Sequence, residues 1–154
     1  MFSFKSLSIV SLAALVASVN AETHTVHFVN NCGFGTPTLV LDGRILSTGA
    51  DFTINGPLDG AIAFLQTGNC GPNGEGCTLI ELELSNNISS CDISLIPPHT
   101  FSVSAGIAYT NGCDGASLTC QSATCPEAFH SASETRTGLI CTVANVDITI
   151  TFCA

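Results

Sequence analysis

Hydrophobic and polar positions alternate with a period of two along several short stretches of this chain. In residues 78–84, Ile80 and Leu82 share one face, while Glu81 and Glu83 share the other. This period is that of a β-strand with one buried face, because successive side chains of a strand point to opposite sides. The same pattern predicts further short strands at 23–29, 38–41, 51–54, 61–66, 92–96, 100–104 and 147–152.

Turn-forming pairs such as Asp42-Gly43 and Asn111-Gly112 separate the candidate strands, and the chain contains fourteen glycines. Many short strands at this spacing are typical of a β-sandwich or a β-barrel. One short helix is expected within 126–134, because a proline is well tolerated in a first helical turn. We therefore predict a single all-β domain over residues 22–154, built as an antiparallel β-sandwich. In its last strand the inward-facing residues are Ile148, Ile150 and Phe152.

Residues 1–21 have the pattern of a secretory signal peptide. Lys5 precedes an apolar run at 7–19, and Val19 and Ala21 place small residues at the two positions that determine cleavage. The alternative is a membrane anchor, but the run is shorter than the roughly 20 apolar residues that span a bilayer. We expect residues 22–154 to be secreted to the extracellular space or the cell wall, as a monomer without a membrane partner.

The charge of the chain excludes one class of partner. Three lysines and arginines stand against twelve aspartates and glutamates, which gives a formal net charge of -9. Without the leader, only Arg44 and Arg136 remain on the basic side. A chain of this charge lacks the basic surface that binds nucleic acid or anionic lipid. Aromatic residues make up 6% of the chain and tryptophan is absent, which disfavours sugar binding by stacking.

All nine cysteines follow the predicted leader, and in an oxidising compartment disulfides are their default use. An odd number leaves at least one thiol unpaired within the chain. The cysteines and histidines show no spacing that is typical of zinc ligands, so we expect neither a metal site nor a cofactor. Asn87-Ile88-Ser89 is the only N-glycosylation sequon, and Asn87 is a candidate for modification if its loop is exposed.

Several sequence blocks resemble the thaumatin-like family in their order along the chain. They are 28–32, 43–55, 78–81 with 92–95, and 125–129 followed by Cys141 and the closing 151–153. Typical members carry a cysteine-rich helical domain between the strands, whereas only four residues separate Cys120 from Cys125 here. The chain is thus similar to a small member of the family without that domain, and the resemblance implies the family's β-sandwich.

The resemblance also implies a disulfide pattern. Carried over by position, it pairs eight cysteines and leaves Cys91 as the free thiol. The implied pairs are Cys32 with Cys153, Cys70 with Cys77, Cys113 with Cys141, and Cys120 with Cys125.

Members of this family carry an acidic cleft that is linked to the binding, and sometimes the hydrolysis, of β-1,3-glucan. The matching residues here are Arg44, Glu81, Asp92 and Glu134, while a further family aspartate falls on Pro97. If the site is catalytic, Glu81 is the candidate acid and Asp92 the candidate base, because glycoside hydrolysis uses a pair of carboxyl groups. Arg44 would then keep Asp92 ionised, and Glu134 would contribute to binding.

The competing interpretation is that the outward carboxylates of the 78–84 strand are simply solvated. The resemblance therefore implies an extracellular protein that binds β-1,3-glucan or another cell-wall polysaccharide, with at most weak endo-β-1,3-glucanase activity. Defence, wall remodelling and host interaction are the roles that fit. The alternative is a non-catalytic structural or effector-like protein that has a protein partner.

Overall fold

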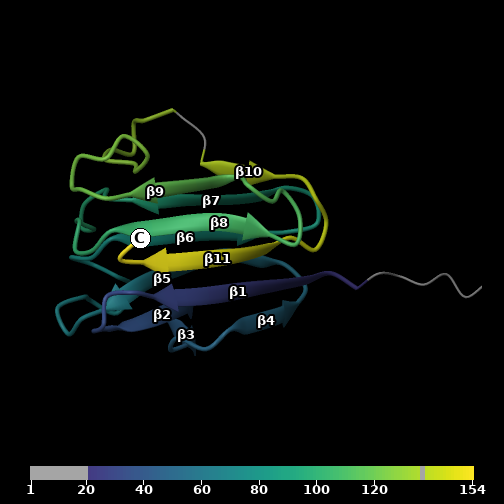
Figure 1. The fold of residues 1–154 in the computed structure, drawn as a ribbon, viewed down its shortest axis with the longest axis horizontal. Helices are drawn as coiled ribbons and strands as arrows, with labels where there is room; N and C mark the ends of the chain where they lie inside the picture. The colour runs from purple at the N-terminus through teal and green to yellow at the C-terminus, as the bar shows by residue number, and fades with distance from the viewer. Residues whose placement is uncertain (1–20, 136–137) are drawn as a thin grey trace, which may run out of the picture.

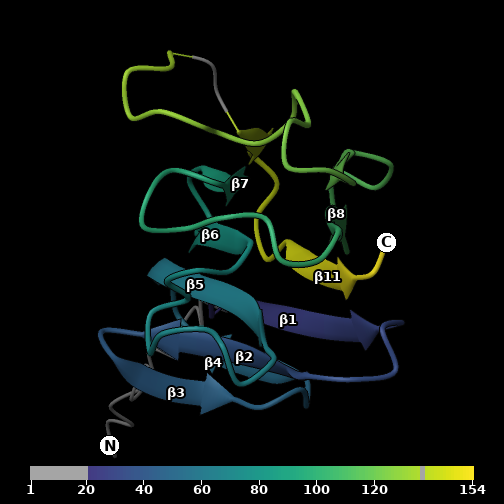
Figure 2. The same cartoon turned by 90° about the vertical axis from the view of Figure 1, so that its left-hand side faces the viewer.

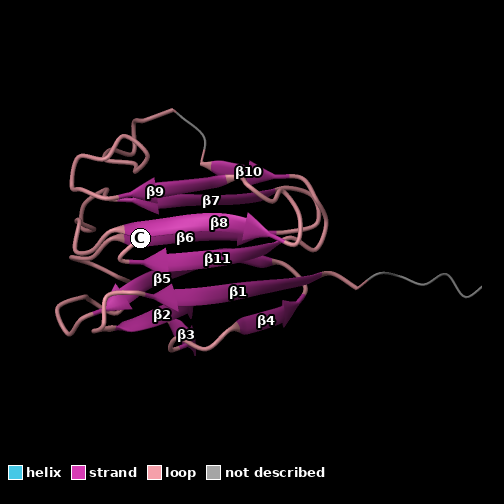
Figure 3. Ribbon diagram, in the orientation of Figure 1, coloured by secondary structure: helices cyan, strands magenta, loops and turns pink. Residues whose placement is uncertain are grey.

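The computed structural model describes residues 21–135 and 138–154, and Figure 3 shows strands joined by turns and loops over this part of the chain. The predicted leader lies outside the described residues apart from Ala21, and it stays a prediction. No described segment forms a helix that could cross a membrane. The strands are β1 (Thr23–Asn30), β2 (Thr36–Leu41), β3 (Arg44–Ser47), β4 (Phe52–Asn55), β5 (Leu58–Gln66), β6 (Leu79–Leu84), β7 (Ser89–Ser94), β8 (Ala105–Thr110), β9 (Ser117–Cys120), β10 (Leu139–Cys141) and β11 (Asp147–Phe152).

The strands form two sheets that pack face to face. One sheet has five strands in the order β4-β1-β11-β8-β9, and the other has six in the order β10-β7-β6-β5-β2-β3. Figure 1 looks through both layers, and Figure 2 shows β8, β11 and β1 in one layer and β7, β6 and β5 in the other. The predicted all-β sandwich is confirmed.

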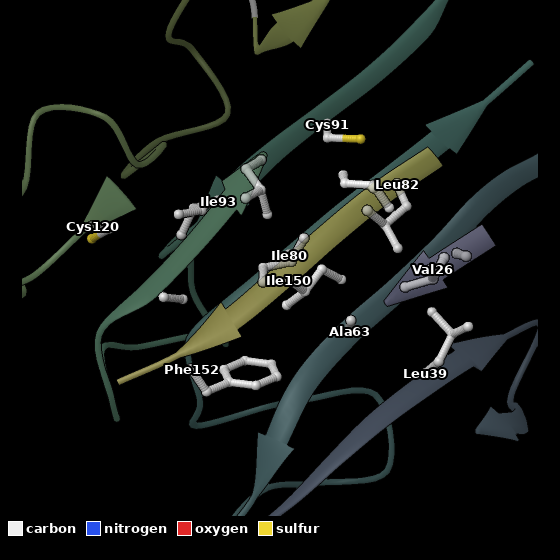
Figure 4. Close-up of a cluster of buried hydrophobic side chains, with 14 of the residues drawn as sticks. Val26, Leu39, Ala63, Ile80, Leu82, Cys91, Ile93, Cys120, Ile150 and Phe152 are labelled. Atoms are coloured by element: carbon white, nitrogen blue, oxygen red, sulfur yellow. The ribbon is translucent and has the colours of Figure 1, made fainter. Parts of the chain in front are cut away.

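The alternating sequence pattern builds the core between the two sheets. Ile80, Leu82 and Leu84 of β6 are buried, as are the inward residues of β11, and both sets belong to one core cluster, part of which Figure 4 shows. Glu81 and Glu83 are exposed on the other face of β6. Burial of apolar side chains from both inner faces is what holds two sheets together.

The first and last strands pair with each other. β1 runs parallel to β11, with Val26 opposite Ile148 and Asn30 opposite Phe152, whereas all other strand pairs are antiparallel. Parallel neighbours need a long crossover connection, and here the crossover consists of all the intervening strands. The last strand of the chain, β11, is therefore the central strand of the five-stranded sheet.

The helix expected within 126–134 is wrong, because this segment forms turns. The backbone of Phe129 pairs instead with the strand end nearby: Phe129 N–H donates to Ile93 O over 2.8 Å, and Leu95 N–H donates to Phe129 O over 2.7 Å. A backbone that makes these bridging contacts is extended. Pairing of Phe129 with the end of β7 has therefore overridden the local preference of 126–134 for a helix.

The strand expected at 100–104 is also wrong, and four strands, β3, β8, β9 and β10, were not predicted from the alternation. Residues 100–104 form a loop whose backbone is held by the Thr78 hydroxyl, which accepts from Ser102 N–H over 2.9 Å and donates to Val103 O over 2.9 Å. Strand β8 follows directly, but its small and apolar residues show little alternation. The short strands β3, β9 and β10, each at the edge of a sheet, complete the four.

Four disulfides crosslink the described chain, and they are the four pairs that the resemblance implies. Their Cα–Cα distances are 5.1 Å for Cys32–Cys153, 5.5 Å for Cys70–Cys77, 6.0 Å for Cys113–Cys141 and 5.4 Å for Cys120–Cys125. Such distances are normal for disulfides.

Cys91 is the free cysteine, and it lies in the core (Figure 4). Burial raises the pKa of its thiol to about 12, so the reactive thiolate is disfavoured. The Tyr109 hydroxyl lies 3.5 Å from Cys91 Sγ and donates a hydrogen bond to Leu139 O over 2.9 Å.

Candidate acidic site on the six-stranded sheet

Glu81 and Asp92 come together on the outer face of the six-stranded sheet. They are direct cross-strand partners in the β6–β7 pair. Side chains at such positions have their Cβ atoms about 4.5–5.5 Å apart and point to the same side. Since the neighbouring Ile80 and Ile93 point into the core, both carboxylates face outward.

A second pair of acidic residues lies in the adjacent row. Asp59 of β5 stands opposite Glu83 of β6. We call Asp59, Glu81, Glu83 and Asp92 the acidic face. Glu81 and Glu83 lie on this side because they are two residues apart in a strand. Asp59 was not predicted as a site residue, because Asp59-Gly60 has the sequence of a turn.

A β-bulge at Gly60 shapes this face. The register of β5 against β6 shifts between Asp59 and Ala61, and the intervening Gly60 has a φ of 74°. That conformation is open to glycine and strained for other residues. The position carries no side chain, and a hollow of about 290 Å³ opens beside it. Its lining residues are Gly60, Ala61, Ile62, Glu81, Leu82, Glu83, Ser90 and Asp92.

Close backbone packing restricts the Asp92 side of the hollow. Gly138, just before β10, lies against β7. A Cβ atom added there would lie 2.5 Å from Cys91 O and 2.9 Å from Asp92 Cβ. Asp92 is accordingly half-buried, while Glu81 is exposed. The two carboxylates thus face one hollow in different surroundings.

Arg44 is not brought beside this pair. It lies on the edge strand β3, four strand positions from β7, which is roughly 19 Å at the usual spacing of strands. Arg44 pairs with Leu41, whereas the row that contains Glu81 continues through Ile62 and Val40. Arg44 is therefore offset by one residue from the cross-strand row that contains Glu81. Among the described residues Arg44 forms no ion pair with a carboxylate.

Glu134 holds its own turn together. Its Oε1 atom accepts hydrogen bonds from His130 N–H over 2.9 Å and from Ser131 N–H over 3.1 Å. Pro97, at the position of a family aspartate, is exposed just beyond β7, and its peptide bond to Pro98 is cis. Of the four residues that match the family's cleft, Glu81 and Asp92 are the pair that the strand register brings together.

A second groove lies farther along the same outer face. It has a volume of about 350 Å³ and includes Ile45, whose side chain is 64% exposed. Beside it, Val40, Phe64 and Leu79 form a small apolar cluster. We call this the apolar groove. Its lining residues are Thr36, Thr38, Gly43, Ile45, Thr48, Phe64, Gln66 and Pro72.

The donor groups of the described residues do not form a metal site. No group of three or more histidine, cysteine, aspartate or glutamate side chains in 21–135 and 138–154 is arranged to hold an ion. The carboxylates of the acidic face are closely spaced hydrogen-bond acceptors with negative charge.

Comparison with known proteins connects this chain to others of similar length. No protein-family model matches it. It is 26% identical over 166 aligned positions to thaumatin-like pathogenesis-related protein 4 of Avena sativa, and the alignment covers 92% of this chain and 93% of the relative.

Two solved structures have the same fold. The thaumatin-like xylanase inhibitor TLXI superposes with a TM-score of 0.52 at 17% identity, over 85% of this chain and 99% of the inhibitor. The protein elicitor MoHrip2 from Magnaporthe oryzae superposes with a TM-score of 0.51 at 15% identity, over 87% of this chain and 100% of the elicitor. At these identities the likeness concerns the fold.

Proposed function

Because the chain is thaumatin-like in sequence and in fold, we propose that it is an extracellular protein of defence or host interaction that binds cell-wall β-1,3-glucan. The observation that carries the proposal is the pairing of Glu81 with Asp92 over one hollow on the outer face of the sheet. Four disulfides support export, since such crosslinks persist in oxidising compartments. The oat relative is named a pathogenesis-related protein, which supports the defence role.

Polar recognition is the mode of binding that the acidic face can provide. Carboxylates accept hydrogen bonds from hydroxyl groups, and charged acceptors form stronger bonds than neutral ones. Among the described residues that line the hollow, none has an aromatic side chain that could stack on a sugar ring. An open hollow on a sheet face can accommodate a polymer that passes across it.

Binding without hydrolysis is the form of the proposal that the geometry favours. Glycoside hydrolysis by two carboxyl groups needs one of them protonated in a site that excludes water. Glu81 is exposed, and the chain lacks the helical domain that forms the opposite wall of the cleft in typical family members. We therefore assign Glu81 and Asp92 to ligand binding and test hydrolysis separately.

The test measures binding to insoluble β-1,3-glucan together with the release of reducing sugar. We expect the wild-type protein to sediment with the glucan and to release no sugar. Glu81→Gln and Asp92→Asn should each raise the Kd by roughly 10- to 150-fold, because a hydrogen bond to a charged group contributes about 1.5–3 kcal/mol. Glu127→Gln is a matched control, because it removes an exposed carboxylate outside the hollow.

Two results would change the assignment. Equal loss of binding in the Glu127 control would show that overall charge, rather than the acidic face, governs sedimentation. Sugar release by the wild type that vanishes in both hollow variants would instead support a weak endo-β-1,3-glucanase.

A protein partner is the second candidate function. It is favoured by the position of the apolar groove, with the exposed Ile45, on the same outer face as the carboxylates. A partner with basic and apolar side chains would complement both regions, and the structural neighbour TLXI is itself an inhibitor of an enzyme. Such binding should weaken as salt rises, whereas binding to a neutral glucan should not.

A further inference from the structure

The hairpin loop between β6 and β7 carries Asn87 into solvent. Asn87 is exposed, and the side chain of its neighbour Ile88 is 57% exposed. The loop lies at the end of the sandwich where β1 begins, since the backbone N–H of Asn86 donates to Glu22 Oε1 over 2.7 Å. In Figure 1 this end lies on the right, where the arrow of β1 begins. A group attached to Asn87 would extend away from the core.

The two neighbouring asparagines of this loop have different roles. Asn86 is half-buried, and its Oδ1 atom accepts a hydrogen bond from Asn145 N–H over 2.6 Å. Asn87 makes no side-chain hydrogen bond with the described residues, so an addition at its Nδ2 atom removes no native contact. Only Asn87 of the two begins an Asn-X-Ser sequon.

The hydroxyl of the sequon serine is occupied in the folded protein. Ser89 is fully buried, its Oγ atom accepts from Ser85 N–H over 3.0 Å, and the hydroxyl donates to Ser85 O over 3.1 Å. The glycosylating enzyme needs this hydroxyl together with the asparagine. Modification therefore has to precede closure of the hairpin.

We infer that Asn87 carries an N-linked glycan, added while the chain enters the secretory compartment. This inference rests on the export assumed in the proposed function. Asn87 Nδ2 forms a bond to C1 of an oligosaccharide that is linked to a lipid diphosphate. The bond between C1 and the diphosphate oxygen breaks, the lipid diphosphate leaves, and Nδ2 loses one proton.

The glycan stands beside the acidic face. Glu83 and Ser90 form the last cross-strand pair before the loop, and both line the hollow. A glycan four residues beyond Glu83 limits the approach of ligands from the hairpin end. It also covers the exposed Ile88, which reduces the apolar surface of the secreted protein.

The test is expression of the full chain in a yeast, with mass analysis of protein from the medium and from the cells. We expect a mass excess that peptide-N-glycosidase removes, with aspartate left at position 87. Asn87→Gln should lack the excess and unfold at a similar temperature, whereas Ser89→Thr should keep the excess because threonine also completes a sequon. Wild-type protein at the mass of the bare polypeptide in both fractions would overturn the inference.

Two further readouts separate this result from the proposed function. Bare protein that begins at Glu22 would show that export occurs without the glycan. The glucan-binding assay, run on wild type and on Asn87→Gln, is independent of the mass result, so loss of one does not imply loss of the other.

Discussion

Among single residues, Glu22 connects three segments at one end of the sandwich. Its Oε1 atom accepts from Asn86 N–H over 2.7 Å and lies 3.2 Å from Nε2 of the buried His24. The other ring nitrogen of His24 lies 2.6 Å from Val146 O. These contacts tie the start of β1 to the β6–β7 loop and to the loop before β11.

The contacts of Glu22 predict a dependence of stability on pH. The hydrogen bond from Asn86 N–H, and then the one from His24, hold the pKa of Glu22 below its ordinary value. A lowered pKa in the folded state contributes stability above the unfolded pKa, and this contribution is lost as pH falls through the folded value. We expect the melting temperature of wild type to fall more steeply than that of Glu22→Gln between about pH 5 and pH 3. An equal dependence of the melting temperature on pH in the two proteins would contradict this role.

Single residues also mark the limit of prediction for the candidate site. Alternation placed Glu81 on the outward face of a strand and predicted a strand that begins at Asp92, whereas the family resemblance was needed to assign the two residues to one cleft. Arg44 could not be placed, since its distance from Asp92 depends on strand order, and a bulge between Leu39 and Val40 changes the phase of β3.

Among the elements, β5 shows how one residue shapes a surface. Its sequence has the signature of a turn at Asp59-Gly60, and a strand was predicted only from residue 61 on. The observed strand starts at Leu58 and accommodates Gly60 as a bulge. The outer face has its hollow at this bulge.

Gly60→Ala tests the contribution of the bulge. The φ of 74° requires the left-handed region, which costs a residue with a side chain about 1–2 kcal/mol. We expect urea unfolding to report a loss of stability of this size, with a weaker affinity for glucan. Ser90→Ala also changes the lining of the hollow, but it introduces no strain in the backbone. The stability of this variant should therefore stay close to that of wild type.

Elements with strong alternation, such as β6 and β11, could be predicted because the contrast between their two faces is encoded locally. Strand β8 could not, because small and apolar residues occupy most of its length and give no contrast. The segment at 126–134 was misassigned for a related reason. Its conformation is set by the pairing of Phe129 with β7 residues, which no local pattern records.

At the scale of the whole molecule, the Cys32–Cys153 disulfide joins the ends of two parallel neighbours. It closes a loop with a sequence separation of 121 residues, against 7 for Cys70–Cys77. In the chain-entropy model, the longer loop contributes about 4–5 kcal/mol and the shorter one about 2.5 kcal/mol. In this model, the outer disulfide contributes the most to stability of the four crosslinks.

Paired replacement of Cys32 and Cys153 by alanine should lower the melting temperature more than replacement of Cys70 and Cys77. Differential scanning calorimetry of each double variant provides the comparison. Cys91→Ala is the control for cysteine removal, because it breaks no crosslink. Equal shifts for the two disulfides would show that loop length does not govern their contributions.

The parallel pairing of β1 and β11 also sets an order for folding during synthesis. The ribosome releases β1 first, yet β11 emerges last, and until then β1 has only β4 as a neighbour. By Ser94 the six-stranded sheet is complete except for its edge strand β10. A nascent chain that stops before Asp147 thus presents one sheet with an uncovered apolar face and Cys32 without its partner. We expect such a truncated product to bind chaperones, because it exposes apolar surface that the full chain buries.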